Sequence, residues 1–255
     1  MAMLEIRALS KHFGGLAAIS ELDLDVNKGE ILGLIGPNGA GKTTLFNVIS
    51  GVYAPTRGKV IFKGEDISSA KPYQVAAKGI VRTFQAAILF QEATVLENVL
   101  VGQYLQQEAN ILGAIFNIPS ARSKEENLQQ RVMGILEFMG LASLTNELAK
   151  NLPHGHQRAL AISISLAANP ELLLLDEPVT GMNPTETLTM ITKIQKIRDS
   201  GVTIAIVEHD MKTVMGLSDR IVVLNYGRKI AEGLPERIRE NRDVIEAYLG
   251  TESGD

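Results

Sequence analysis

Residues 36–43 read Gly-Pro-Asn-Gly-Ala-Gly-Lys-Thr, which matches the spacing G-x-x-x-x-G-K-[ST] at every fixed position. The residues before it, 30–35, form a short apolar run that is typical of a buried parallel strand. The residues after it, 43–50, predict a helix that ends at Gly51. A strand, a glycine-rich turn and a helix in this order predict an α/β unit with a phosphate-binding loop between its strand and its helix.

The residues of this loop suit the binding of phosphate. Glycines let successive main-chain N–H groups turn inward around phosphate oxygens, and the N-terminus of the following helix adds partial positive charge. Lys42 would reach the β- and γ-phosphates, and the Thr43 hydroxyl would ligate Mg²⁺. An ordinary glycine-rich turn is the alternative. We expect a nucleoside triphosphate with Mg²⁺, held by Gly36, Pro37, Asn38, Gly39, Ala40, Gly41, Lys42, Thr43 and Thr44.

The composition is that of an ordinary globular protein. Of the 255 residues, 45% are hydrophobic and 21% charged, and the net charge of −4 gives no sign of a nucleic-acid-binding surface. The chain has no cysteine, which excludes disulfides and thiol chemistry. No apolar run approaches the ~18 residues that span a bilayer, and the N-terminus lacks the pattern of a signal peptide. We expect a cytosolic protein that needs a separate membrane partner if it works at a membrane.

The N-terminal part predicts a small antiparallel layer beside the phosphate-binding strand. Residues 4–9 and 19–26 alternate apolar and polar side chains, as half-exposed strands do, and residues 60–62 are a third, shorter candidate. A further strand is expected over residues 80–84, and it ends at Gln85.

Between residues 94 and 150 the pattern changes from α/β to helical. Residues 113–123, which include Pro119, predict a loop within this interval. We expect residues 94–150 to form a mostly helical subdomain inserted into one domain, 1–255. Apolar side chains recur at helical spacing on either side of the loop, at Leu96, Val99, Leu100 and Tyr104, and at Leu128, Val132, Ile135, Leu136 and Met139.

After this insertion the α/β pattern returns. The first of its strands ends in Asp176 and Glu177, at the carboxyl end where open α/β sheets bind their ligands. Asp176 would hold Mg²⁺, directly or through water, and Glu177 would polarise or deprotonate the attacking water. A strand that ends in a polar turn is the alternative. The pattern predicts strands at residues 172–175, 203–207, 221–224 and 229–231, and helices at 156–168, 184–199 and 235–249.

With these two motifs the chain resembles, essentially end to end, the nucleotide-binding subunit of an ATP-binding cassette (ABC) transporter. The resemblance implies a P-loop NTPase (RecA-like) core with an N-terminal antiparallel β layer and an inserted helical subdomain, and it implies ATP and Mg²⁺ as ligands. Gln85 matches the glutamine loop of the family, and His209 matches its switch histidine. Phe13 matches the aromatic residue that stacks on adenine.

The resemblance also implies a role for each of these residues. Residues 180–184 match the loop that crosses to the other subunit of a dimer. Taken singly, Gln85, His209 and Phe13 could each be an ordinary structural residue, and their order around the two motifs favours function. The implied catalytic residues are Glu177, His209, Gln85 and Lys42, and the implied metal contacts are Thr43, Gln85 and Asp176.

One segment departs from the family pattern. Where the family usually has Leu-Ser-Gly-Gly-Gln, this chain has Leu152-Pro153-His154-Gly155-His156. In the family this segment binds the γ-phosphate of the nucleotide held by the other subunit, and Pro153 supplies neither a hydroxyl nor an N–H donor. We expect Leu152, His154, Gly155 and His156 to contact the partner's nucleotide, with His154 or His156 as the replacement donor. An ordinary helix start is the alternative.

Several segments resemble the branched-chain (hydrophobic) amino-acid uptake group: residues 12–16, 81–85, 181–184 and 244–250, together with the helical insertion. This resemblance implies integral-membrane permease subunits, a second ABC ATPase subunit and, indirectly, a periplasmic or extracellular substrate-binding protein as partners. The chain would then lie on the cytoplasmic face of the membrane. Urea or amide importers and lipopolysaccharide exporters look similar. A soluble ABC ATPase without a permease and a regulatory nucleotide-binding module stay open as alternatives.

Overall fold

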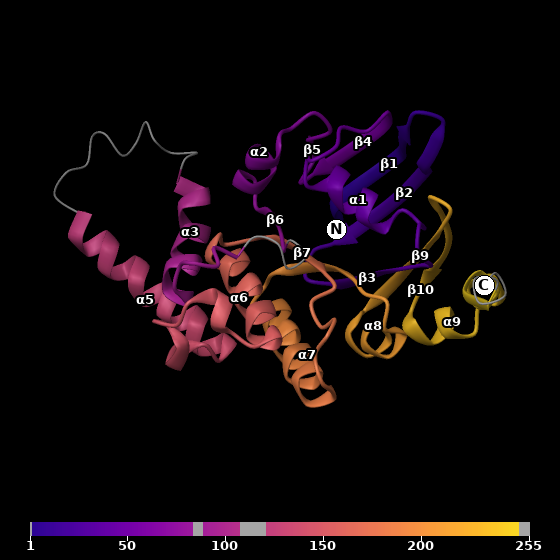
Figure 1. The fold of residues 1–255 in the computed structure, drawn as a ribbon. Helices are drawn as coiled ribbons and strands as arrows, with labels where there is room; N and C mark the ends of the chain where they lie inside the picture. Colours follow the sequence, from indigo (N-terminus) through magenta and orange to yellow (C-terminus); the bar gives the residue numbers. More distant parts are fainter. Residues whose placement is uncertain (1, 84–88, 108–120, 250–255) are drawn as a thin grey trace.

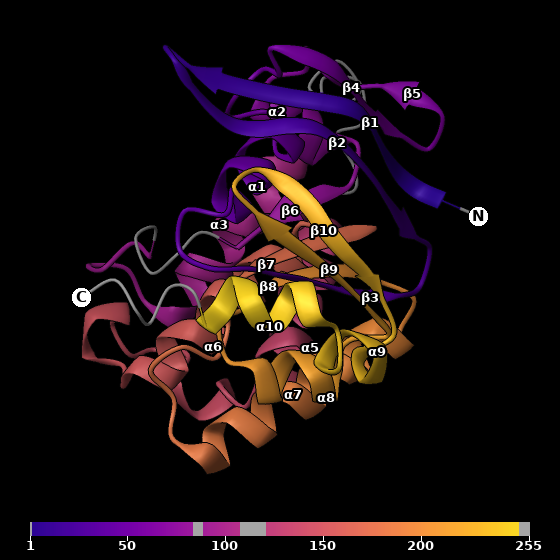
Figure 2. The same ribbon diagram turned by 90° about the vertical axis from the view of Figure 1, so that its right-hand side faces the viewer.

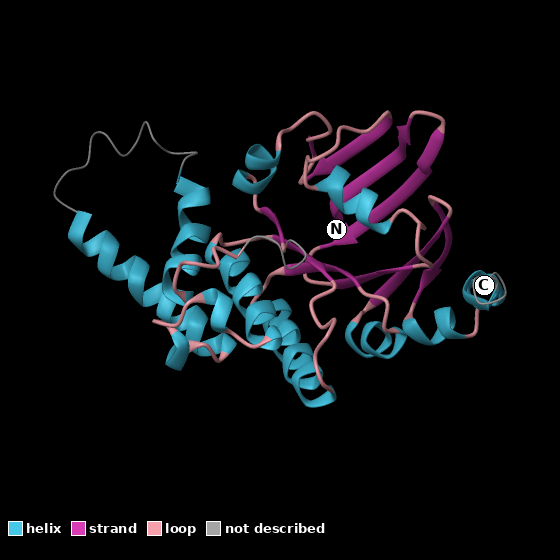
Figure 3. Cartoon of the chain, in the orientation of Figure 1, coloured by secondary structure: helices cyan, strands magenta, loops and turns pink. Residues whose placement is uncertain are grey.

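The computed structural model describes residues 2–83, 89–107 and 121–249 of the chain. Two β-sheets form the centre of the molecule, and a group of helices extends from one end (Figure 1; helices and strands are separated by colour in Figure 3). The larger sheet has six strands in the order β10-β9-β3-β8-β7-β6. They are β3 (Ile31–Ile35), β6 (Ile80–Arg82), β7 (Leu172–Asp176), β8 (Thr203–Val207), β9 (Arg220–Asn225) and β10 (Arg228–Gly233). All neighbours are parallel except β9 and β10.

The central strands β3, β7 and β8 are buried along their whole length. Alternate side chains point to two different cores. Leu172 and Leu174 of β7 pack with α1 (Lys42–Ile49) and the second sheet, whereas Leu173 and Leu175 pack with the helices α6 (His154–Ala167) and α7 (Pro184–Asp199). Because both faces are covered, these strands need continuous apolar runs, as the sequence has.

The second sheet is antiparallel and has the order β2-β1-β4-β5. Its strands are β1 (Ala2–Phe13), β2 (Leu16–Asn27), β4 (Arg57–Phe62) and β5 (Glu65–Asp66). Apolar residues of β1, β2 and β4 join Leu45 and Phe46 of α1 in one core cluster, so α1 packs between the two sheets. This sheet is the predicted antiparallel layer, and its first two strands extend further than the alternation indicated.

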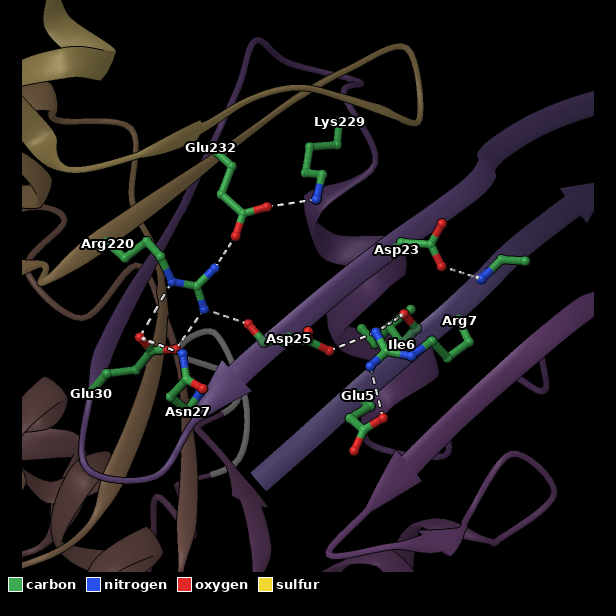
Figure 4. A network of polar contacts seen from close by, with 11 residues as sticks. Glu5, Ile6, Arg7, Asp23, Asp25, Asn27, Glu30, Arg220, Lys229 and Glu232 are labelled. Atoms are coloured by element: carbon green, nitrogen blue, oxygen red, sulfur yellow. Dashed lines mark hydrogen bonds and ion pairs between the residues drawn. The ribbon is translucent and has the colours of Figure 1, made fainter. Parts of the chain in front are cut away.

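A network of charged side chains ties the two sheets together at one edge (Figure 4). Arg220 at the start of β9 pairs with Glu30 at 2.7 Å, contacts Glu232 of β10, and donates to the Asp25 carbonyl of β2 at 2.6 Å. The Asp25 carboxylate pairs in turn with Arg7 of β1 at 2.7 Å. Arg220 therefore links strands of both sheets through a largely buried guanidinium.

The helices lie mainly on the side of the parallel sheet that faces away from the antiparallel sheet. Apolar residues of α3 (Val95–Gln107) and α5 (Ala121–Met139) share a core cluster with α6 and α7. Nearer the β10 edge of the sheet, α8 (Met211–Leu217), α9 (Pro235–Arg239) and α10 (Arg242–Leu249) share a small cluster with β9 on that same face (Figure 2). A further helix is α2 (Pro72–Ala77), and short 3₁₀ turns lie at η3 (Ala142–Leu144) and η4 (Ala149–Asn151).

Two predictions about helices were wrong in detail. The loop expected over residues 113–123 ends earlier, because α5 already begins at Ala121. The single helix expected over residues 235–249 is two helices, because α9 ends at Arg239 and the Asn241 side chain accepts a hydrogen bond from the Val244 N–H at 3.2 Å, as a helix-capping residue does. The assignment of residues 94–150 as an inserted subdomain stays a prediction.

Within residues 2–83, 89–107 and 121–249, no helix combines the length and the apolar character needed to cross a membrane.

Candidate functional site

Three loops that carry predicted site residues meet at one edge of the parallel sheet. Strand β8 lies between β3 and β7, and all three run in the same direction, so their carboxyl ends share an edge. The phosphate loop follows β3, Asp176 and Glu177 lie at the end of β7, and His209 follows β8. Residues that are far apart in the sequence are therefore brought together as predicted for a nucleotide site.

The phosphate loop has a backbone that only glycine can adopt at two positions. Gly36 and Gly41 have φ angles of 151° and 104°. A Cβ atom on Gly36 would lie 2.1 Å from the Leu224 carbonyl oxygen, and one on Gly41 would lie 2.6 Å from the Ala18 carbonyl oxygen. Gly41 is also the N-cap of α1 and provides no side-chain cap. The first-turn N–H groups of α1 are thus left for an anion.

Lys42 folds back into the mouth of this loop. Its ammonium donates to the carbonyl oxygens of Gly36 at 2.5 Å and Pro37 at 3.0 Å. Burial lowers the pKa of Lys42 below its usual value, and the negative charges of Glu177 and Asp176 oppose that shift. The ammonium therefore lies in the electrostatic field of both carboxylates. At this position its positive charge would attract a bound phosphate.

Asp176 is a buried carboxylate with one oxygen engaged and one open. Its Oδ2 pairs with Arg82 at 2.7 Å, and its side chain is only 2% exposed. Its Oδ1 is buried and has no hydrogen-bond partner among the described residues.

This arrangement fits Mg²⁺. The described residues contain no cluster of three or more His, Cys, Asp or Glu side chains that could hold a metal by themselves. Magnesium, however, usually takes one or two protein oxygens, with substrate phosphates and water completing its shell. The unpartnered Oδ1 of Asp176 and the hydroxyl of Thr43, which is an exposed residue, are the oxygens that could supply such a donor set.

Glu177 adopts an unusual backbone conformation directly after Asp176. Its φ angle is +50°, in the left-handed region that non-glycine residues rarely occupy, and its N–H donates to the Val207 carbonyl of β8 at 2.9 Å. Its side chain is 28% exposed, so solvent reaches it. His209 Nδ1 lies 3.9 Å from Glu177 Oε1, and the imidazole is 61% exposed. The two predicted catalytic side chains therefore face each other across the sheet edge.

Glu208 is a further site residue, to which sequence reasoning assigned no role. It is 1% exposed, and its Oε1 accepts a hydrogen bond from the Val179 N–H at 2.9 Å. Its Oε2 lies 3.9 Å from His209 Nδ1. Burial raises the pKa of Glu208, while the Val179 hydrogen bond and His209 oppose the shift. Glu208 thus connects the loop after Glu177 to His209, and its only sequence signal is its position before that histidine.

Phe13 lies at the end of β1 and is 42% exposed. Its ring packs edge to face against Tyr53, with centroids 5.2 Å apart, and the Lys11 ammonium lies 5.1 Å from its centroid. The ring is therefore held in place while part of it stays open, as an adenine-stacking residue requires. Gln85 lies outside the described residues, so its expected role stays a prediction.

The segment at 152–156 begins α6. Leu152 is buried, Pro153 is the N-cap residue without a side-chain cap, and His154 is the first helical residue. Pro153 fits here because it has no N–H to leave unsatisfied at the helix start. The segment is thus both a helix start and an exposed surface beside the loop at 180–184.

The two histidines of this segment lie on different sides of α6. The His154 ring lies over Gly181, where a Cβ atom would come within 3.1 Å of its Cε1 atom. His156 instead borders a small cleft with Met139 and Lys193. Residues two apart on a helix do not share a face, so the two imidazoles have different surroundings.

A cavity of about 340 Å³ separates the core from the helices of the 94–150 interval. Its walls include Ala76 of α2, Arg82 of β6, Val101 of α3, and His154 and Ile164 of α6. The lining is largely apolar. It includes Arg82, whose side chain forms the ion pair with Asp176. The cavity therefore borders Arg82, the ion-pair partner of Asp176, on one side and α3 on the other.

Comparison with known proteins agrees with this geometry. Residues 19–180 match the family model described as ABC transporter, and residues 228–253 match one described as branched-chain amino acid ATP-binding cassette transporter. The chain is 44% identical to the high-affinity branched-chain amino acid transport ATP-binding protein LivG of Escherichia coli strain K12, and 43% identical to BraF of Pseudomonas aeruginosa. Each alignment covers 97% of this chain and 98% of the relative.

Solved structures are similar as well. The crystal structure of the ADP conformation of an ATP-binding cassette of an ABC transporter superposes with a TM-score of 0.86 at 33% identity, covering 98% of this chain and 99% of that one. A nucleotide-free ATP-binding cassette gives the same TM-score at 32% identity.

Proposed function

The chain belongs to the ABC transporter family, and from this membership we propose that it is the ATP-binding and ATP-hydrolysing subunit of an importer for branched-chain or other hydrophobic amino acids. The observation that supports this most is the meeting of the phosphate loop, Asp176, Glu177 and His209 at one sheet edge. The substrate class is supported by the full-length similarity to LivG and BraF and by the match at residues 228–253.

The site residues would share the work of hydrolysis. Lys42 would exchange its bonds to the Gly36 and Pro37 carbonyls for bonds to phosphate oxygens of ATP. Glu177 would orient the attacking water and accept its proton, and His209 would hydrogen-bond the γ-phosphate. Thr43 and Asp176 would hold Mg²⁺, which would supply positive charge to offset the charge of the phosphates.

A second cassette, identical or a close paralogue, would complete the site. Residues 152–156 would cap the nucleotide of that partner, and the loop at 180–184 would cross to it. Solved ABC transporter cassettes of the same fold include a dimeric one, with a TM-score of 0.78 to this chain. ATP favours the closed pair only if it binds that state more tightly than the open state, and hydrolysis then reverses the preference.

The permease would dock at the cavity between α2, α3 and α6. This cavity is apolar, lies outside the phosphate loop, and borders the helices of the 94–150 interval, so a short cytoplasmic helix of a membrane subunit fits its shape and chemistry. The chain would then lie on the cytoplasmic face of the membrane, and a periplasmic or extracellular substrate-binding protein would act on the other side through the permease.

Co-purification tests this assignment. The tagged chain, expressed with its neighbouring genes, should bring permease subunits with it from detergent-solubilised membranes. Recovery of an active ATPase that never carries a membrane subunit would contradict the importer and favour a soluble ABC ATPase.

A further inference from the structure

The ion pair between Arg82 and Asp176 has a second arm that reaches the phosphate-loop helix. Arg82 Nη2 contacts Asp176 Oδ2 at 2.7 Å, and Arg82 Nη1 contacts Asn47 Oδ1 at 2.6 Å. The guanidinium carbon lies 5.6 Å from the centroid of the Phe46 ring. The Arg82 side chain is 6% exposed and is thus held on three sides.

Asn47 links this contact to the predicted metal site. Asn47 and Thr43 lie four residues apart in α1 and share one face of the helix. Asp176 is held a second time by the residue that follows β6, because its N–H donates to Thr83 Oγ1 at 3.1 Å. The end of β6 therefore contacts both the strand that carries Asp176 and the helix that carries Thr43.

We propose that Arg82 is a positioning residue that clamps α1 to β7 and thereby sets the distance between Thr43 and Asp176, the two side chains that would hold Mg²⁺. The clamp leaves Asp176 Oδ1 as the carboxylate oxygen open to the metal, since Oδ2 is occupied by the guanidinium. This inference rests on the proposed nucleotide site and adds to it a residue that does not touch the nucleotide.

The charge of Arg82 and the geometry of its hydrogen bonds have opposite effects on the affinity for a metal ion. A positive charge beside Asp176 weakens the attraction of a cation, whereas two fixed hydrogen bonds hold the metal-binding side chains at their working distance. The variant Arg82→Lys keeps the charge but cannot span both partners with one nitrogen. The variant Asn47→Ala removes one arm and leaves the Arg82–Asp176 ion pair in place.

Mn²⁺ binding to the ADP-bound protein tests the clamp without any turnover. The protein is kept in excess over ADP, and free Mn²⁺ is followed by its electron paramagnetic resonance signal. We expect the Mn²⁺ dissociation constant to rise about tenfold in Arg82→Lys and in Asn47→Ala, as it does when a residue that orients a metal ligand is lost. Arg220→Lys is the matched control, because it makes the same change in another largely buried arginine of the sheet, and it should leave Mn²⁺ affinity unchanged.

A purely structural ion pair predicts a different result. Unchanged or tighter Mn²⁺ binding in folded Asn47→Ala protein overturns the clamp even if Arg82→Lys fails to fold. A wild-type protein that binds no Mn²⁺ in its ADP complex overturns the proposed nucleotide site as well, whereas normal wild-type binding with unchanged variants overturns the clamp alone.

Discussion

His209 Nδ1 lies 3.9 Å from Glu177 Oε1, although the two residues follow different strands of the sheet. Glu177 is held in a left-handed backbone conformation at the end of β7, and His209 follows the neighbouring strand β8. A carboxylate and an imidazole in this arrangement can orient one water molecule and one phosphate oxygen between them. This pair predicts that Glu177 and His209 act together in ATP hydrolysis.

Replacing Glu177 with glutamine should abolish turnover and keep binding. The amide has the same shape but cannot accept the proton of the attacking water, so we expect ATP hydrolysis to fall by about 10²–10⁴-fold. Affinity for ATP, measured with a fluorescent analogue, should stay near the wild-type value. Equal hydrolysis rates in the wild type and the variant would remove Glu177 from the mechanism.

Glu177 and His209 should behave as one unit. A double-mutant cycle with Glu177→Gln and His209→Ala, measured by phosphate release, should give a double variant that loses less activity than the product of the two single losses. Strictly multiplicative losses would mean that the two side chains act independently, despite their facing positions.

Glu208 should make stability depend on pH. Burial raises its pKa in the folded protein, so the folded state holds this proton more tightly than the unfolded chain does. Its contribution to stability is therefore present below the ordinary pKa of a glutamate and is lost as the pH rises through the raised value.

The variant Glu208→Gln is the test, because its side chain stays neutral and can still accept from the Val179 N–H. Relative to this variant, the wild type should lose stability as the pH rises above the ordinary pKa of a glutamate, as measured by urea unfolding. Parallel pH profiles for the two proteins would show that the raised pKa has no effect on folding.

His154, rather than His156, should contact the partner's nucleotide. Its ring lies over Gly181, in the loop predicted to cross to the other subunit, whereas His156 lies on a different side of the helix. In a Glu177→Gln background, ATP-driven dimerisation should weaken about tenfold or more in His154→Ala, as the loss of a charged hydrogen bond predicts.

His156→Ala should leave that dimerisation near its parent value, so it is the control for His154→Ala. Light scattering after gel filtration measures both. Unchanged dimerisation when both histidines are replaced would show that neither imidazole substitutes for the usual donors.

The sequence predicted the parts of this protein that depend on neighbouring residues. The phosphate loop and the buried strand that ends in Asp176 and Glu177 are local patterns, in which residue type and order fix the backbone and the chemistry together. The two motifs end β3 and β7, which have β8 between them, and this strand order depends on long-range pairing that no local pattern contains.

Other features depend on contacts that no local pattern contains. Arg82 bonds Asp176 across 94 positions of the sequence and Asn47 across 35, and the burial of Glu208 is visible only when β7 and β8 lie side by side. The break between α9 and α10 was missed because the amphipathic pattern continues across Asn241. The Asn241 side chain caps a new helix by accepting from the Val244 N–H, and the pattern alone does not distinguish this cap from a continuous helix.

The central claim is that this chain powers amino-acid import, and uptake into proteoliposomes tests it most directly. The vesicles contain the chain with its co-purified membrane subunits. ATP is supplied on the side of the cassette, and the substrate-binding protein encoded by a neighbouring gene is supplied on the other side. These vesicles should accumulate labelled leucine, isoleucine or valine. The same vesicles built with Glu177→Gln should not. ATP-dependent uptake of urea without uptake of any of these amino acids, or equal leucine uptake with both cassettes, would contradict the account.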